Sequence, residues 1–484
     1  MIASNSHEVK IILVSFFMCL SFFISFHGYI KNNGSYYPET PTALAYSVYQ
    51  YNSFSHYKAG VYYKDGVIIN QENVASSKIP IFEHPGYGWL MGLAWKVTGS
   101  LKYYDMQIVQ MLLFVFSCLL LYWGLFAALL DSQKALWAAC LVPLFFPLLF
   151  LNVNPIRDIY CFYGAAVLFY LFSYAYYKEL SIKQMTTGGL FIALCQWMRP
   201  TIFGSLVLGF CFIMGYSYFY KREKFLNICL LGSILAVTNG IGFWAPWTLF
   251  NKQVHGRYFA APSGQQLLDS MGWTGPNKIN PDCPDTNNGL YCDGCVTQYT
   301  VKRFNLDTTK TKVGTSAMDD KMGEAFWEWF CQDPIFWVKG FLWRIKKVLL
   351  LDLTWSTTYG WNWKYYNSFS KYSDRLNAAY SFGFYNLLEF LFRRWFVRVF
   401  MILGYFGALC LIYEQKFFLL GLLISLTAGG IAPAIISHAE HRYLTPFYFI
   451  YPLLAGYFLY IFCLNIGVVW FRLFSKKRIY MDIL

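Results

Sequence analysis

The stretch IPIFEHPGYGWLMGLAWKVTG, residues 79–99, raises the central question about the fold. An acid and a base, Glu83 and His84, precede a Pro-Gly break, and an apolar, aromatic run then ends at Gly99. A proline-glycine pair marks a turn, and a glycine after an apolar run is a common helix stop. The stretch therefore predicts an apolar helix introduced by ionisable side chains, and its setting must be found in the rest of the chain.

The composition places this helix in a membrane protein. Of 484 residues, 57% are hydrophobic and 13% are charged, whereas soluble proteins carry roughly 25% charged residues. Apolar runs near the roughly 20 residues that cross a bilayer recur along the chain. The first run, residues 11–30, is too long for a signal-peptide core and has no cleavage site after it, so we interpret it as a retained helix. We predict an all-α integral membrane protein with about ten to twelve transmembrane helices.

The net charge is +13. The positions of the basic residues orient the chain in the membrane, and they do not indicate nucleic acid as a partner. The basic residues form short clusters between apolar runs, at 177–184, 220–224 and 471–478, and do not form one groove-lining patch. By the positive-inside rule these clusters and both termini face the cytoplasm. The predicted location is the inner membrane of a bacterium.

This topology divides the chain into five segments, two of them large and periplasmic. Residues 333–353, in the second of these, mix basic and large apolar side chains, which is typical of an amphipathic helix in the membrane interface. The segments are a tail with the first transmembrane helix (1–30), a periplasmic segment (31–105), transmembrane helices two to seven (106–249), a second periplasmic segment (250–396), and the C-terminal transmembrane helices with a cytoplasmic tail (397–484).

The individual transmembrane helices are bounded by charged or proline-containing turns. The residue before a proline is biased away from helix, so Arg199-Pro200 predicts a break between two adjacent segments. Residues 379–395 leave room for a further short span. The predicted helices after the first are 106–130, 135–152, 159–177, 186–198, 201–219, 225–249, 397–413, 417–436 and 443–465.

Four cysteines lie in the second periplasmic segment, and most of the other cysteines stand singly in apolar helices. Disulfides persist outside the inner membrane, so these four are disulfide candidates. Free thiols and a zinc knuckle are the alternatives, although zinc is disfavoured because the sequence has one C-x-x-C here and no nearby histidine. The candidates are Cys283, Cys292, Cys295 and Cys331.

Ionisable side chains gather at the predicted periplasmic ends of several helices. Such groups at membrane depth usually serve a function, and a carboxylate among cations suits proton removal beside a phosphate. Each also has a simpler explanation: a solvated loop acid, a helix-start acid or a snorkelling arginine. The candidates are Glu39, Glu83, His84, Arg157, Asp158, Arg199, Lys252, His255, His438, Glu440, His441 and Arg442.

Several stretches together resemble the polytopic GT-C glycosyltransferases, in the order in which that superfamily carries them. The resemblance extends from about residue 36 to 455, and the isolated Glu39 is also similar to that of the serotype-converting glucosyltransferases of O-antigen. The matching stretches are PETPTALAYSVYQ (38–50), HPGYGWLMGLAWKVTGS (84–100) with the span after it (106–124), QWMRPTIFGSLVL (196–208), WAPWTLFNKQVHGRYFAAPSGQQLL (244–268) and EHRYLTPFYFIYPLLAGY (440–457).

This resemblance implies a GT-C-like bundle with membrane-parallel helices in both large segments. It implies inverting transfer of a sugar from a polyprenyl-phosphate donor to a periplasmic glycan or lipid-linked acceptor such as O-antigen, with an upstream synthase supplying the donor. The helix within 79–99 would lie flat on the membrane and floor the site. The implied roles are catalysis for Glu39 and Asp158, donor-phosphate binding for Arg442, Arg199, Arg157 and Lys252, and sugar binding for Glu83, His84, Glu440, His441 and Tyr443.

Three departures and three alternatives bear on this interpretation. Glu39 has no neighbouring acid, so the sequence lacks the paired-acid motif that would support a divalent metal. The chain has Phe250 and Lys252 around Asn251 where the superfamily often has Arg-Asn after its Pro-Trp motif, and Pro85-Gly86 where two prolines are common. The alternatives are an O-antigen polymerase or ligase, a lipid or glycan transporter, and a non-catalytic membrane subunit.

Overall fold

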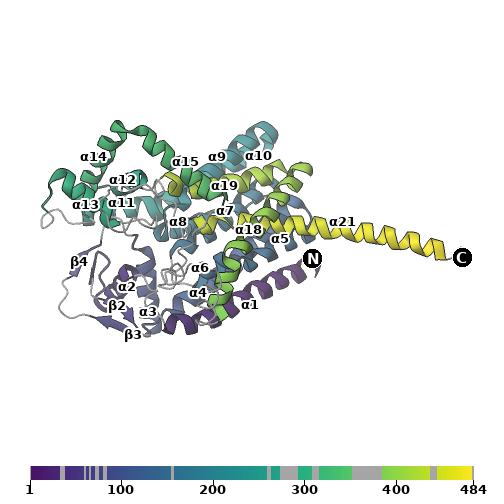
Figure 1. Ribbon diagram of the computed structural model, residues 1–484, viewed down its shortest axis with the longest axis horizontal. Helices are drawn as coiled ribbons and strands as arrows, with labels where there is room; N and C mark the ends of the chain where they lie inside the picture. Colours follow the sequence, from purple (N-terminus) through teal and green to yellow (C-terminus); the bar gives the residue numbers. More distant parts are fainter. Residues whose placement is uncertain are drawn as a thin grey trace, which may run out of the picture.

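The structure is a computed structural model, shown in Figure 1, and it forms a long bundle of helices. The first and last helices have their chain ends at one end of the bundle, whereas the short strands and the helices between 263 and 332 gather at the other end. The described backbone covers residues 2–32, 39–58, 61–64, 67–70, 76–79, 84–153, 157–258, 263–272, 293–307, 315–350, 384–436 and 444–481.

The bundle confirms the prediction of a helical, multi-pass membrane protein. Among the described residues, six helices are long and apolar enough to cross a bilayer, or seven if one bent pair counts as a span. Two shorter apolar helices, Val397–Tyr413 and Phe417–Pro433, add to the bundle. The six are Ser6–Ile24, Asp105–Leu129, Arg157–Tyr177, Ile202–Tyr220, Arg222–His255 and Thr445–Ile466.

Helix boundaries follow the predicted ones closely in the first half of the chain and less closely after it. The bounds are α1 Ile2–Asn32, α2 Glu39–Tyr51, α3 Gly86–Thr98, α4 Tyr104–Leu129, α5 Ser132–Leu141, α6 Phe146–Val153, α7 Tyr160–Tyr177, α8 Ile182–Met198, α9 Ile202–Tyr220, α10 Arg222–Asn239, α11 Ala245–His255, α12 Ser263–Gly272, α13 Asp293–Phe304, α14 Ser316–Gln332, α15 Pro334–Leu350, α18 Phe384–Tyr413, α19 Phe417–Ile436 and α21 Ile450–Met481.

Helix α7 lies at the centre of the bundle and packs against α4, α8 and α9. Its sequence, YCFYGAAVLFYLFSYAYY, is apolar or aromatic on every side, and such a helix is stable only when it is surrounded. The glycine pair Gly204 and Gly429 lets α9 and α19 cross with their backbones in contact. Close approach at small residues is a principal source of stability between helices in lipid, where water does not drive association.

The apolar helix of residues 79–99 is α3, and glycines bring α2 onto it. A Cβ added at Gly92 would lie 2.5 Å from the Ala45 carbonyl oxygen, and one at Gly88 would lie 2.6 Å from the Cβ of Leu44. The two glycines are four residues apart and therefore share one face of α3. The Thr42 hydroxyl also bonds the hydroxyl of Tyr103, just before α4. The Pro-Gly turn thus begins a helix whose glycine face receives α2.

Several predicted elements differ from the observed ones. The predicted 135–152 helix is divided into α5, a 3-10 turn (η1, Val142–Leu144) and α6, with a bend of 58° at this proline-containing sequence. The predicted 225–249 helix contains a π-helical turn (η3, Gly240–Trp244) between α10 and α11. The predicted 397–413 helix begins earlier, at Phe384, so the proposed separate span at 379–395 is wrong where the structure describes it.

The first large segment also contains strands, which the all-α prediction did not include. Two antiparallel pairs form, each of short strands. Asp65-Gly66, the sequence between β2 and β3, is a pair that favours a two-residue hairpin connection. The strands are β1 His56–Lys58 paired with β4 Ser76–Lys78, and β2 Val61–Lys64 paired with β3 Val67–Asn70.

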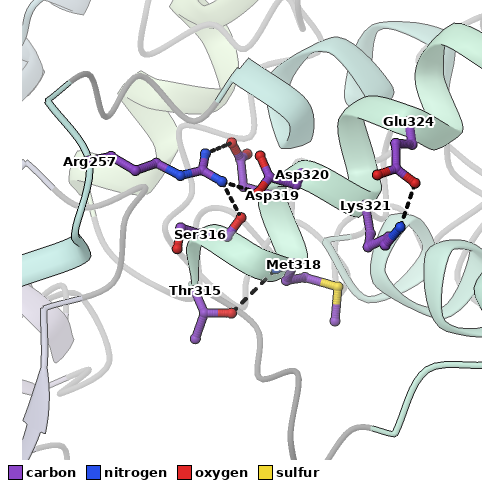
Figure 2. A network of polar contacts seen from close by, with 8 residues as sticks. All are labelled: Arg257, Thr315, Ser316, Met318, Asp319, Asp320, Lys321 and Glu324. Carbon is purple, nitrogen blue, oxygen red and sulfur yellow. Dashed lines mark hydrogen bonds and ion pairs between the residues drawn. The ribbon is translucent and has the colours of Figure 1, made fainter.

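The second large segment has its own small core, where α12, α13, α14 and α15 meet around residues such as Leu268, Met322 and Phe326. Figure 2 shows how the chain leaving α11 is fixed to it: Arg257 donates to the Ser316 carbonyl oxygen at 2.9 Å and also bonds the Asp320 carboxylate. The Thr315 hydroxyl caps the start of α14. These contacts anchor α14 to the end of the α10–α11 span.

Helix α15 lies where residues 333–353 predict an amphipathic helix, but one of its cations faces the protein interior. Arg344 is fully buried, and it donates to the carbonyl oxygens of Ser270 at 2.9 Å, of Ile436 at 3.3 Å and of Ile435. These carbonyls belong to the last turns of α12 and α19, where the helix dipole favours a cation. Burial lowers the pKa of this guanidinium to about 10, so it stays charged at neutral pH.

The α2–α3 contact gives a first prediction. Replacing Gly92 by Ala forces a methyl group into the Ala45 carbonyl, and overpacking of this kind costs roughly 1–3 kcal/mol. We expect a lower melting temperature in detergent for Gly92→Ala. The matched control is Gly215→Ala in α9, where an added Cβ meets nothing within 4 Å. Equal melting temperatures for the two variants would contradict the observed packing.

Candidate functional site

The ends of several helices that carry predicted site residues meet at the end of the bundle away from the chain termini. The start of α2 packs on α3 through the Pro41 carbonyl and Gly88, and the start of α3 packs on the end of α8, because Gly86 lies against the Trp197 carbonyl. The break between α8 and α9 then faces the turn before α7. A proline lies within a few residues of each of these starts or stops, so the sequence itself ends the helices here.

Asp158 and Arg199 form a buried ion pair between two of these helix ends. Arg199 Nε lies 3.0 Å from Asp158 Oδ1, and the side chains are 10% and 4% exposed. Asp158 lies in a 3-10 turn, η2 (Arg157–Ile159), that leads into α7, and Arg199 is the C-cap of α8. The predicted Arg199-Pro200 break is therefore confirmed, and it turns the arginine towards the start of α7.

Arg157 and His84 complete a group of four ionisable side chains. Arg157 donates weakly, at 3.4 Å, to the backbone carbonyl oxygen of His84. The His84 ring packs on Trp247, with 5.6 Å between ring centroids. Its Nδ1 atom is buried and has no hydrogen-bond partner among the described residues. Two arginines, one aspartate and a histidine are thus brought together at these helix ends.

Burial and the two arginines determine the charge of His84. Removal from water, followed by the positive charges of Arg157 and Arg199, holds the pKa of the His84 imidazole well below its usual value of 6.5. The ring is neutral at physiological pH, so it presents one donor and one acceptor nitrogen. An anion bound by the arginines would offset their charge and make protonation of His84 easier.

A layer of aromatic rings covers one side of this group. Trp197 of α8 contacts Trp89 of α3 at 5.2 Å and Trp247 of α11 at 5.6 Å, and the Phe250 ring stacks on Trp247. The Trp197 indole donates to the Gly242 carbonyl at 2.8 Å, within the π-helical turn. π-Helical turns are frequent at functional sites. Such rings can form part of an interfacial belt, and they also provide flat apolar surfaces on which sugar rings can stack.

Beneath the ionisable group, a buried polar network joins α4, α6 and α7. The Tyr163 hydroxyl lies 3.0 Å from the Gln110 carbonyl oxygen and 2.5 Å from Asn152 Oδ1, and Gln107 donates to the Val153 carbonyl at 2.7 Å. The Tyr87 hydroxyl of α3 reaches Gln110 at 3.3 Å. Hydrogen bonds between buried polar groups fix the relative positions of the helices that carry them. A buried group that loses its partner is left without compensation, so breaking such a bond is costly. This network holds the turn before α7 in place.

The remaining predicted residues divide into two sets. Lys252 is exposed, bonds the Gly256 carbonyl oxygen and lies over the Tyr258 ring, so no described contact joins it to Arg157 or Arg199. Glu39 begins α2, but its side chain lies outside the described residues. Residues Glu83, His438, Glu440, His441, Arg442 and Tyr443 also lie outside the described residues, and their roles remain predictions.

Of the four disulfide candidates, one has a described side chain. Cys331 is exposed and unpaired at the end of α14, so it forms no disulfide with a described cysteine. Cys283 and Cys292 lie outside the described residues, as does the side chain of Cys295. Among the described residues there is also no cluster of three or more histidine, cysteine or acidic side chains that could hold a metal ion.

Sequence reasoning missed the tryptophans of the aromatic layer and the buried Arg344. The tryptophans carry no charge, and in a chain with 21% aromatic residues they do not stand out from an interfacial belt. Arg344 lies among basic residues of α15 and is distinguished from them only by what packs around it. A helical projection would not have identified it, because Ile335 and Leu342 fall on the opposite face and Arg344 would be assigned to the exposed polar face.

No protein-family model matches the sequence, and the curated proteins include no match to it. Among solved structures, the chain is similar to the archaeal oligosaccharyltransferase AglB from Archaeoglobus fulgidus, solved with an inhibitory peptide and a dolichol-phosphate. The TM-score is 0.44 at 14% identity over 97% of this chain, which spans about half (52%) of that protein.

The ion pair gives a second prediction. Arg199→Met leaves the Asp158 carboxylate buried without its counter-charge, which typically costs roughly 3–5 kcal/mol. We expect a large fall in melting temperature for this variant. The double variant Asp158→Leu/Arg199→Met should regain most of the stability, because two apolar side chains replace two buried charges. A double variant as unstable as Arg199→Met alone would contradict the assignment of that loss to an unpaired buried carboxylate.

The His84 environment gives a third prediction. Because its folded pKa is depressed, the unfolded chain binds a proton below about pH 6.5 that the folded chain does not bind, so stability falls as the pH drops. We expect the loss of melting temperature between about pH 7 and about pH 5 to be smaller in His84→Gln than in the native protein. His56→Gln, at an exposed histidine of β1, is the control. An unchanged loss in His84→Gln would contradict the described environment.

Proposed function

We propose that this protein is a membrane glycosyltransferase that moves a sugar from a polyprenyl-phosphate donor to a periplasmic glycan or lipid-linked acceptor such as O-antigen. The observation that carries the proposal is the group formed by the buried pair Asp158 and Arg199 with the half-buried Arg157 and His84, at the meeting point of helix ends. The two guanidinium groups suit a phosphate, and the neighbouring tryptophans suit a sugar. The ordered GT-C resemblance supplies the reaction class.

Arginine is well suited to this task because its guanidinium can donate two parallel hydrogen bonds to phosphate oxygens. The Asp158 carboxylate lies 3.0 Å from Arg199 Nε, so its charge keeps the guanidinium beside the turn before α7. This commitment makes Asp158 a better candidate for orienting Arg199 than for removing a proton, which revises the catalytic role predicted for it. Arg442 would add a further cation, and Lys252, which is exposed, has the weakest case.

Glu39 is the proposed general base. It begins α2, and the same end of α2 packs on Gly88 of α3, close to the point where α3 meets Trp197. In the proposed step, the acceptor hydroxyl oxygen attacks the anomeric carbon while the bond from that carbon to the phosphate oxygen breaks. The carboxylate takes the hydroxyl proton, and polyprenyl phosphate leaves with both bonding electrons. A single displacement of this kind inverts the anomeric configuration.

A lipid or glycan transporter is the alternative in which no bond is broken. Transporters usually place their substrate site near the bilayer midplane, between repeated halves. Here the ionisable group lies at helix ends, and the sequence shows no internal repeat. A polymerase or ligase would differ in consuming pyrophosphate-linked glycans, and the choice of donor tests it.

A transfer assay gives the fourth prediction. Purified protein is incubated with synthetic polyprenyl-phosphate-glucose and a lipopolysaccharide acceptor. We expect transfer by the native protein and a loss of roughly 10²–10⁴-fold in Glu39→Gln, with donor binding retained, because only proton removal is impaired. The stability-restored Asp158→Leu/Arg199→Met variant should instead lose donor binding.

The transfer assay has one control variant and two outcomes that would contradict the proposal. Glu324→Gln removes an exposed acid of α14 and should transfer sugar at the native rate. Equal transfer by Glu39→Gln would reassign the base to another acid such as Glu440. Absence of transfer with every polyprenyl-phosphate sugar, together with lipid movement across vesicles, would replace the enzyme by a transporter.

A further inference from the structure

The two faces of α15 differ sharply in what surrounds them. Gly340, Arg344 and Val348 recur at every fourth residue and form the buried face, which packs towards α12 and α19. At 100° per residue, the opposite face carries Ile335 and Leu342. It also carries Val338, Lys339 and Lys346, all exposed to solvent.

This exposed face is apolar in its middle and cationic along one edge. Ile335, Val338 and Leu342 are 64%, 45% and 57% exposed, although large aliphatic side chains are normally buried. Lys339 and Lys346 stand beside them, one helical turn and three helical turns after Ile335. An aliphatic stripe bordered by lysines is typical of a helix that lies in the headgroup region of a bilayer.

Arg344 fixes the depth at which this face lies. It bonds the Ile436 carbonyl oxygen at 3.3 Å, and Ile436 is the last residue of the apolar helix α19. An apolar helix ends where the hydrocarbon region ends, so the residues bonded to its last carbonyls lie at the membrane surface. Figure 1 shows α15 beside α19, between the bundle and α14. The outward face of α15 therefore lies level with the end of the apolar helix α19.

We propose that this face of α15, residues Ile335, Val338, Lys339, Leu342 and Lys346, docks on anionic phospholipids of the bilayer. The aliphatic side chains enter the boundary between headgroups and acyl chains. The lysine stems lie along that boundary, and their ammonium groups reach the lipid phosphates. The charge on this face favours anionic over zwitterionic headgroups. The proposal does not depend on the transfer reaction.

The test uses photocrosslinking of the full-length protein in nanodiscs made of equal parts phosphatidylglycerol and phosphatidylcholine. Benzoylphenylalanine replaces Leu342 in one variant, Ile335 in a second, and the exposed Ala317 of α14 in a control. Mass spectrometry after irradiation identifies what each position touches. We expect phospholipid adducts at 342 and 335, absent at 317, with phosphatidylglycerol in several-fold excess over phosphatidylcholine.

The lysines are tested in the same experiment. Lys339→Gln/Lys346→Gln should bring the ratio of phosphatidylglycerol to phosphatidylcholine adducts close to one while the total remains high. Adducts to a second protein chain, or no adducts at either position, would overturn docking on lipid. Equal adducts of the two lipids in the unsubstituted lysine background would overturn the selectivity for anionic headgroups. Two crosslinking positions guard against misfolding of either variant.

Discussion

A buried ion pair, Asp158 with Arg199, is the constraint on which the candidate site depends. Two charges with so little exposure are tolerated only when they face each other, because each would otherwise lose its hydration without compensation. The turn before α7 and the break after α8 must therefore stay adjacent. Pro200 breaks the helix so that Arg199 can turn inwards, and the network of Gln107, Gln110, Asn152 and Tyr163 holds the partner turn from below.

Close backbone approach at glycines extends this arrangement to the first large segment. Gly86 places the start of α3 against α8, and Gly88 and Gly92 admit α2 onto α3. Through these contacts the beginning of α2, where Glu39 stands, is tied to the helix ends that carry the arginines. The Pro-Gly turn within residues 79–99 starts a helix, α3, that contacts both α2 and α8. His84, just before that turn, belongs to the ionisable group.

Under the proposed function, the charges in this site suit transfer from a phosphate-linked donor more than passage through a membrane. They lie at helix ends, are backed by aromatic rings and include a neutral histidine whose protonation would respond to a bound anion. At the other anchoring point, Arg344 uses backbone carbonyls of α12 and α19 in place of a carboxylate. The two arginines show different ways to bury a cation: Arg199 by an acidic partner and Arg344 by helix C-termini.

The sequence by itself determined the class of the protein, most helix boundaries in the first half, and the residue types of the site. Composition and apolar periodicity report membrane insertion directly, and Pro200 reports the break that frees Arg199, because both effects act within a few residues. The π-helical turn, the bend after α5 and the early start of α18 could not be read in this way, since their local sequences are also compatible with straight helices or a separate span. Only the tertiary structure decided that Asp158 pairs with Arg199, that Lys252 points away, that tryptophans from three helices form one layer, and that Arg344 is buried while Lys346 is exposed. The physical reason is that pairing and burial depend on contacts between residues far apart in the chain, which local sequence patterns do not encode.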